Sequence, residues 1–164
     1  MEMLNIRPAR EDDAAAIAEI YNYYVAGSTA TFDVEAKTEV DRRAWIASRS
    51  HKHPVIVGER GSRLVAYAVL SPWNMRPAWG DTVELGVYVA EDLRGTGAGT
   101  QMLDAAVTAA REAGHHVVLA QVVGGNEASL RLLANAGFEV VGTMREVGNK
   151  FSERLDVVLL ELIL

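Results

Sequence analysis

Hydrophobic and polar positions change period several times along the chain, and each change marks the start or end of an expected element. Residues 4–7 are typical of a short first strand. Apolar side chains then recur at the spacing of one helix face through residues 17–24, which predicts a helix that ends near Gly27. Thr38 and Asp41 have the spacing of a capping box, so a second helix is expected to begin there.

The middle of the chain predicts three strands. Residues 55–59 and 64–71 are rich in β-branched and apolar side chains, and they flank Arg60-Gly61-Ser62, a sequence that favours a hairpin turn. Residues 82–89 predict the third strand. A glycine-rich segment follows, and beyond it residues 102–110 carry an apolar helix face.

The remaining residues predict a buried strand at 117–122, a helix from Asn126 to Gly137, and two strands at 138–143 and 155–163. This order predicts the mixed α/β class (an α+β mixed sheet), a twisted central sheet with helices on both faces. The apolar periodicity continues from end to end, so the 164 residues are expected to form one domain, 1–164.

Composition narrows the possible chemistry. The chain has no cysteine, which excludes disulfides, thiolate metal sites and a cysteine nucleophile. Its net charge of -6 argues against nucleic acid as a partner. No secretory or membrane-spanning segment is visible, so a cytoplasmic location away from membranes is expected. His51 and His53 lack a third ligand nearby, so no metal site is expected.

The glycine-rich segment is the most informative part of the chain. It lies between an expected strand and an expected helix, where glycines and a helix N-terminus favour phosphate binding. The Gly-Lys-Ser or Gly-Lys-Thr of a Walker loop is missing, and the glycine spacing differs from that of a dinucleotide fingerprint. Arg94-x-x-Gly97-x-Gly99 remains as a third pattern, with an ordinary strand-to-helix turn as its alternative.

Glu84 is a carboxylate inside an otherwise apolar strand. Alternation places it on one face with Gly86 and Tyr88, and the glycine is expected to leave space beside the carboxylate. From the residues alone, Glu84 is either a catalytic group or an exposed or ion-paired strand glutamate.

At this point the sequence resembles the GCN5-related N-acetyltransferase (GNAT) family, and within it the phosphinothricin and methionine sulfoximine acetyltransferase branch. The glycine motif and the order of elements carry the first resemblance. The second rests on Ile6-Arg7-Pro8-Ala9, Ile20-Tyr21-Asn22, Thr29-Ala30-Thr31-Phe32, residues 82–89, Asn126-Glu127-Ala128-Ser129, residues 147–151 and residues 155–159.

The resemblance implies an acetyl-CoA-dependent N-acetyltransferase with a GNAT-like fold. Acetyl-CoA would be a co-substrate, and its pyrophosphate would lie on the glycine loop. Asn126 could equally be a plain helix N-cap. The implied cofactor-binding residues are Val87, Tyr88, Val89, Arg94, Gly95, Thr96, Gly97, Ala98, Gly99, Thr100, Asn126 and Ser129.

The resemblance also implies that Glu84 is the general base. Acetylation needs a neutral amine, and a carboxylate, acting directly or through water, accepts the proton. Many relatives carry Tyr or His as a general acid at the position of Leu133, and leucine cannot donate a proton. Either the thiolate then leaves unassisted, or water serves, or the protein binds acetyl-CoA with slow turnover.

For the acceptor, the resemblance implies an L-amino acid or a toxic analogue such as phosphinothricin, methionine sulfoximine or methionine sulfone. Asn74 stands where this branch carries an arginine for the acceptor's carboxylate, and Arg76 is the expected substitute. Aromatic side chains in this set could equally pack in the core or at a dimer interface. The expected acceptor-binding residues are Thr29, Phe32, Trp73, Asn74, Met75, Arg76, Leu85, Gly86, Lys150 and Phe151.

Two other functions stay open at this stage. The acceptor could be a protein N-terminus or a lysine side chain. Alternatively, the protein could be a non-catalytic acetyl-CoA sensor, a hypothesis suggested by Leu133 at the position of the general acid. A homodimer is expected from the resemblance alone.

Overall fold

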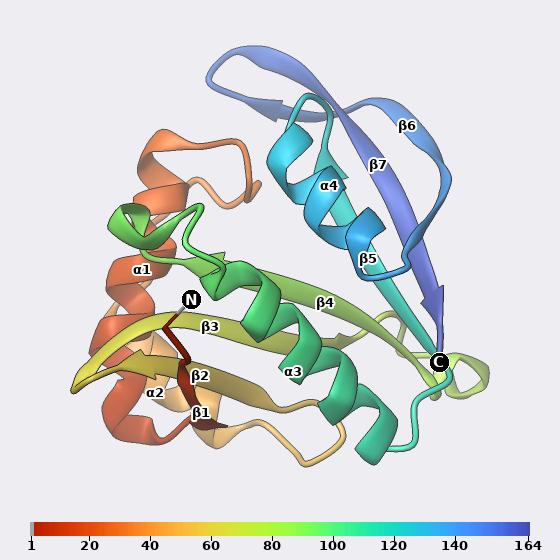
Figure 1. Ribbon diagram of the computed structural model, residues 1–164. Helices are drawn as coiled ribbons and strands as arrows, with labels where there is room; N and C mark the ends of the chain where they lie inside the picture. Colours follow the sequence, from red (N-terminus) through yellow and green to blue (C-terminus); the bar gives the residue numbers. More distant parts are fainter. Residues whose placement is uncertain (1) are drawn as a thin grey trace.

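One seven-stranded sheet organises the computed structural model, which describes residues 2–164 (Figure 1). The strand order is β1-β2-β3-β4-β5-β7-β6. The strands are β1 (Asn5–Pro8), β2 (Val55–Arg60), β3 (Arg63–Pro72), β4 (Thr82–Val89), β5 (Val117–Val123), β6 (Glu139–Lys150) and β7 (Glu153–Ile163). The helices are α1 (Ala14–Gly27), α2 (Glu39–Ala47), α3 (Ala98–Glu112) and α4 (Glu127–Asn135). The mixed sheet confirms the predicted fold class.

Helices cover both faces of the sheet and bury two apolar clusters (Figure 1). On one face, α1 and α2 pack around Ile17 and Tyr67, which is the largest fully buried side chain. On the other face, α3 buries Met102 and Leu103, and α4 adds Leu133 to the same cluster. The sheet therefore has a dry core on each side, and its strands are held firmly from both directions.

Sequence signals at the helix ends act as expected. Thr38 caps α2 by accepting from the Asp41 N–H at 3.0 Å, and the Asp41 carboxylate accepts from the Thr38 N–H at 2.8 Å. Asn126 caps α4 by accepting from the Ser129 N–H at 3.2 Å. Gly137 follows α4 with φ at 91°, a left-handed conformation that favours glycine.

β4 and β5 are the one parallel pair in the sheet described for residues 2–164, and they pair over only three residues. Thr82–Glu84 lie opposite Val117–Leu119, and no pairing continues beyond that point. β3 stays paired with β4 to Val89, and β7 stays paired with β5 to Val123. Each half of the sheet thus keeps its own partners while the two halves separate, as Figure 1 shows between β4 and β5.

The end of the chain differs from the prediction. The strand expected at 138–143 continues to Lys150, seven residues beyond its predicted end. β6 is an edge strand whose side chains are mostly exposed, and its register with β7 shifts twice. Bulges of this kind interrupt the hydrophobic alternation from which a strand is predicted. Glu146 takes the left-handed conformation, with φ at 56°, inside the second shift.

Three short 3₁₀ helices also lay outside the prediction: Glu11–Asp13, Pro77–Trp79 and Glu91–Leu93. No helix among residues 2–164 has the length and apolar composition needed to cross a membrane.

Candidate active site

A cleft of about 1290 Å³ lies where β4 and β5 separate. It is open between the carboxyl ends of two parallel strands, a position at which α/β sheets commonly bind ligands. β4 leads into the glycine-rich segment and α3, and β5 leads into α4, so two helix N-termini face the opening. The segment 28–32 after α1 closes a further side.

The glycine-rich segment lines one end of the cleft. Gly95 and Gly97 have φ at 74° and 88°, a conformation that side chains disfavour. Gly97 is the N-cap of α3, and the first turn of that helix carries no acidic side chain. The free N–H groups and positive end of a 15-residue helix therefore face the cleft, which suits an anion. Ala98 is fully buried in the core and is not among the residues that line the cleft.

All the cofactor-binding residues predicted from the sequence, except Ala98, line this cleft. Those that line it are Val87, Tyr88, Val89, Arg94, Gly95, Thr96, Gly97, Gly99, Thr100, Asn126 and Ser129. One backbone group is already occupied, because the Tyr24 hydroxyl donates to the Val89 carbonyl at 2.5 Å. Burial raises the pKa of the Tyr24 phenol, so it remains a donor at neutral pH.

Glu84 lies where the β4–β5 pairing ends, opposite Leu119. Its side chain is half-buried, and its Oε1 accepts a hydrogen bond from Gln121 Nε2 at 2.8 Å. Gln121 is not among the site residues predicted from the sequence. Its signal was a polar side chain inside the apolar run 117–123.

Val69 and Tyr88 pack closely against Gly86. A Cβ at this position would meet Val69 Cγ1 at 3.2 Å and Tyr88 Cε2 at 3.3 Å, so these side chains would have to shift to admit it. Gly86 lines the cleft, as Glu84 does, and the expectation that it leaves space beside the carboxylate stays a prediction. Burial raises the pKa of the Tyr88 phenol, which keeps its hydroxyl protonated.

Acceptor-side residues divide into two groups. Thr29, Phe32, Leu85 and Gly86 line the cleft. The loop with Trp73, Asn74, Met75 and Arg76 does not line it; this loop leaves the sheet one residue pair beyond Glu84, and Met75 is 88% exposed. Asn74 Oδ1 accepts from the Arg76 N–H at 3.0 Å, which makes a local turn.

Lys150 does not reach the cleft either. Its side chain is buried, and Nζ donates to the carbonyls of Tyr24, Ser28 and Thr31 at 3.3, 2.6 and 2.8 Å. Burial lowers the pKa of this ammonium group. Phe151 lies in the exposed turn after β6. The structure thus corrects the expected direct contact of Lys150 with the acceptor: this side chain anchors the 28–32 segment, which itself lines the cleft.

Ionisable side chains are sparse around the cleft. Among the lining residues that the structure describes, Arg94 is the one side chain with a positive charge and Glu84 the one carboxylate. Arg94 Nη2 donates to the Tyr23 hydroxyl at 3.0 Å, which holds the guanidinium at the glycine-loop end. Leu133 lines the cleft from α4, as the sequence implied, and is 6% exposed. Within residues 2–164, no group of three or more His, Asp or Glu side chains is placed to hold a metal ion.

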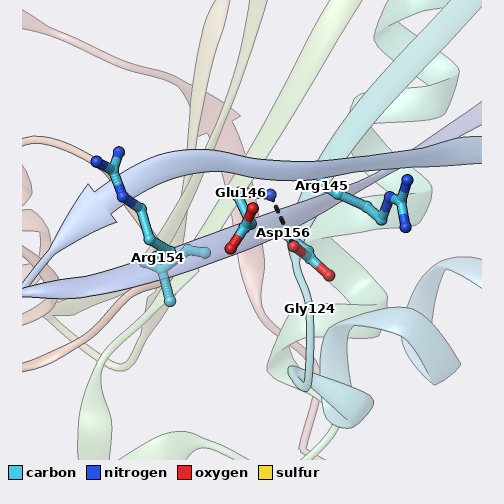
Figure 2. Close-up of a pocket in the computed structure, with 6 residues that line it drawn as sticks. Gly124, Arg145, Glu146, Arg154 and Asp156 are labelled. Carbon is cyan, nitrogen blue, oxygen red and sulfur yellow. Dashed lines mark hydrogen bonds between the residues drawn. The ribbon is translucent and has the colours of Figure 1, made fainter.

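A second, shallower hollow of about 900 Å³ lies on the β6–β7 hairpin (Figure 2). The Asp156 carboxylate accepts from the Glu146 N–H at 2.8 Å and so fixes the bulge in β6. In Figure 2, the side chains of Arg145 and Arg154 point away from one another. No residue predicted for the site lies in it.

Comparison with known proteins identifies the family. Residues 13–138 match the model of the acetyltransferase (GNAT) family. The chain belongs to this family. Membership confirms the family resemblance and the prediction of an acetyl-CoA-dependent N-acetyltransferase.

Relatives and solved structures of GNAT proteins match almost the whole chain. The L-amino acid N-acyltransferase MnaT of Escherichia coli K12 is 37% identical over 97% of this chain and 93% of its own. The phosphinothricin N-acetyltransferase of Streptomyces coelicolor is 36% identical over 94% of this chain and 92% of its own.

Two solved structures superpose with a TM-score of 0.95. One is an acetyltransferase of Salmonella typhimurium with its cofactor acetyl-CoA, 34% identical, covering 99% of this chain and 94% of that one. The other is the ribosomal-protein-alanine N-acetyltransferase of Brucella melitensis, 36% identical, covering 98% and 100%.

Replacing Lys150 by methionine tests the anchor of the 28–32 segment. The change keeps the apolar stem and leaves three carbonyls without their donor. We expect a loss of about 2–3 kcal/mol in the free energy of unfolding, or a fall in Tm of roughly 5–10 °C for a chain of this length. Thermal unfolding measures it, with Lys52→Met, at an exposed lysine, as the matched control. A Tm equal to that of the control would show that Lys150 is not an anchor.

Proposed function

We propose that this GNAT enzyme transfers the acetyl group of acetyl-CoA to the primary amine of an L-amino acid or a toxic analogue, with Glu84 as the general base. The observation that carries the proposal is the single cleft between β4 and β5. It joins a glycine loop at a helix N-terminus, which suits an anion, to the carboxylate of Glu84.

On this proposal the pyrophosphate of acetyl-CoA lies on Gly95–Thr100, where the N-terminus of α3 and Arg94 supply positive charge. The pantetheine arm lies between the separated strands beside Val87 and Tyr88. The Asn126 side-chain oxygen is used as the cap of α4, which leaves its amide group to donate to the arm. Ser129 lines the cleft beside it.

The chemical step follows from the position of Glu84. Its carboxylate accepts the proton of the acceptor ammonium, directly or through water, and the neutral nitrogen attacks the thioester carbon. The tetrahedral intermediate carries negative charge on oxygen, and a backbone N–H of β4 past the end of its pairing with β5 is suited to stabilise it. Collapse of the intermediate breaks the C–S bond, and the nitrogen gives its second proton to water. The amide product and the CoA thiolate then leave, and Glu84 returns its proton to solvent.

The departing thiolate receives no proton from α4, because Leu133 stands there. A thiolate is a good leaving group near neutral pH, because the pKa of an ordinary thiol is about 8.5. Water in the open cleft can protonate it afterwards. A general acid is therefore unnecessary for turnover.

The choice of acceptor rests on the relatives, whose names describe acylation of L-amino acids and phosphinothricin. A protein N-terminus is the second candidate, because the Brucella structure bears the name of a ribosomal-protein-alanine N-acetyltransferase. The homodimer and the cytoplasmic location stay predictions.

An amine panel distinguishes these acceptors. Release of free thiol from acetyl-CoA is measured with phosphinothricin, methionine sulfoximine, methionine sulfone, the common amino acids, and peptides with free N-termini. We expect release with the amino acids and analogues and little with peptides. Release with peptides alone would make the protein-acetylating function the correct one. No thiol release with any amine, together with binding of acetyl-CoA in calorimetry, would indicate a sensor.

Replacing Glu84 by glutamine tests the base. Loss of the proton acceptor is expected to lower kcat near pH 7 by about 10²-fold or more, with the Kd for acetyl-CoA unchanged. Glu112→Gln, at the exposed end of α3, is the matched control. An E84Q enzyme with the turnover of this control would refute the assignment.

Replacing Gly97 by valine tests the cofactor loop. The conformation at φ 88° disfavours a β-branched side chain, so the loop shifts and the Kd for acetyl-CoA rises by about tenfold or more. Gly61→Val is the matched control: its φ is 61°, a Cβ there meets nothing within 4 Å, and it lies in the β2–β3 turn outside the cleft. Equal affinity in the two variants would count against the loop as the pyrophosphate site.

A further inference from the structure

Gln121 is the one polar side chain in β5. Its neighbours within the strand are Val, Leu and Ala, and most of them are buried. Leu119 pairs with Glu84, and Gln121 lies two residues further along, so alternation places Gln121 on the face of the sheet that carries Glu84. An exposed glutamine contributes little to packing, so its place in this strand calls for a different reason.

The contact between Gln121 and Glu84 crosses the opening of the sheet. Gln121 Nε2 donates to Glu84 Oε1 at 2.8 Å, and both side chains line the cleft. The backbones of β4 and β5 are no longer paired at Gln121. A carboxylate only accepts hydrogen bonds, which determines that the amide nitrogen, and not the amide oxygen, faces Glu84.

We propose that Gln121 is a positioning residue for Glu84. It holds Oε1 from the far side of the opening and leaves Oε2 to receive the proton of the acceptor amine. This inference rests on the proposed role of Glu84 as the base. Without the amide, the carboxylate is free to sample several rotamers in the open cleft, and few of these direct an oxygen at the amine.

The first test replaces Gln121 by leucine, which ends one atom short of the amide nitrogen and has no donor. We expect kcat/KM for the amine to fall about tenfold at neutral pH, with the Kd for acetyl-CoA within twofold of the wild type. Gln101→Leu is the matched control. That glutamine lies on α3, outside the cleft lining, and accepts from the Leu4 N–H at 2.8 Å, so the same change removes a comparable hydrogen bond elsewhere.

A second variant, Gln121→Glu, keeps the length of the side chain and places a carboxylate against Glu84. Like charges at this distance repel, so we expect a larger loss than in Q121L at neutral pH. Activity equal to that of the wild type in both variants would overturn the proposal. Circular dichroism and Tm confirm that each variant is folded.

A double-mutant cycle decides whether Gln121 acts through Glu84. If it does, Q121L lowers kcat/KM in the wild type and changes it less than twofold in the E84Q background. The same fold loss in both backgrounds would show that Gln121 acts by itself and would overturn the proposal. The two single variants together separate the two hypotheses. An active E84Q enzyme refutes the base, whereas an inactive E84Q enzyme with a fully active Q121L enzyme refutes only the positioning role.

Discussion

The parallel contact between β4 and β5 ends after Glu84 and Leu119, and the position of the cleft depends on that ending. Parallel strands need a crossover connection, and here α3 supplies it. Antiparallel partners on both outer sides keep each half of the sheet intact while the halves separate. The opening therefore costs only the few hydrogen bonds that a longer β4–β5 pairing would add. It gives the cleft two strand edges and two helix N-termini.

The positive and negative charges around the cleft lie in different parts of it. Arg94 and the N-terminus of α3 lie at the glycine-loop end, and Glu84 lies between the strands. Between them the lining is largely neutral, which suits a pantetheine arm. Lys150, a buried cation near the cleft, donates its hydrogen bonds to three carbonyls of α1 and the segment that follows. It shapes the acceptor end through the backbone and does not contribute charge to it.

Local signals predicted much of this fold. The alternation at 82–89 predicted both ends of β4 correctly. The spacing of Thr38 and Asp41 predicted the cap of α2. The length of β6 could not be read in this way, because an exposed edge strand with two bulges has no regular apolar face. The positive φ of Glu146 has no sequence signal either, since it depends on the Asp156 carboxylate.

The site residues that could be predicted are those whose role depends on neighbours close in the sequence. The glycine loop and Asn126 were found from short patterns. The anchoring role of Lys150 depends on partners about 120 residues away, and Gln121 meets a partner 37 residues away. Tertiary contacts of that range leave no periodic trace in the chain. The loop at 73–76 was assigned from resemblance, and its exposed course beyond the β3–β4 pairing places it outside the cleft lining.

The most direct measurement is a crystal structure of the protein with acetyl-CoA bound. We predict that the pyrophosphate contacts the N–H groups of Gly95–Thr100 and that the thioester lies between β4 and β5. Its carbonyl carbon would then face the side of the sheet that carries Glu84 and Gln121. A cofactor bound with its thioester on the opposite side of the sheet, or outside the β4–β5 opening, would contradict the account.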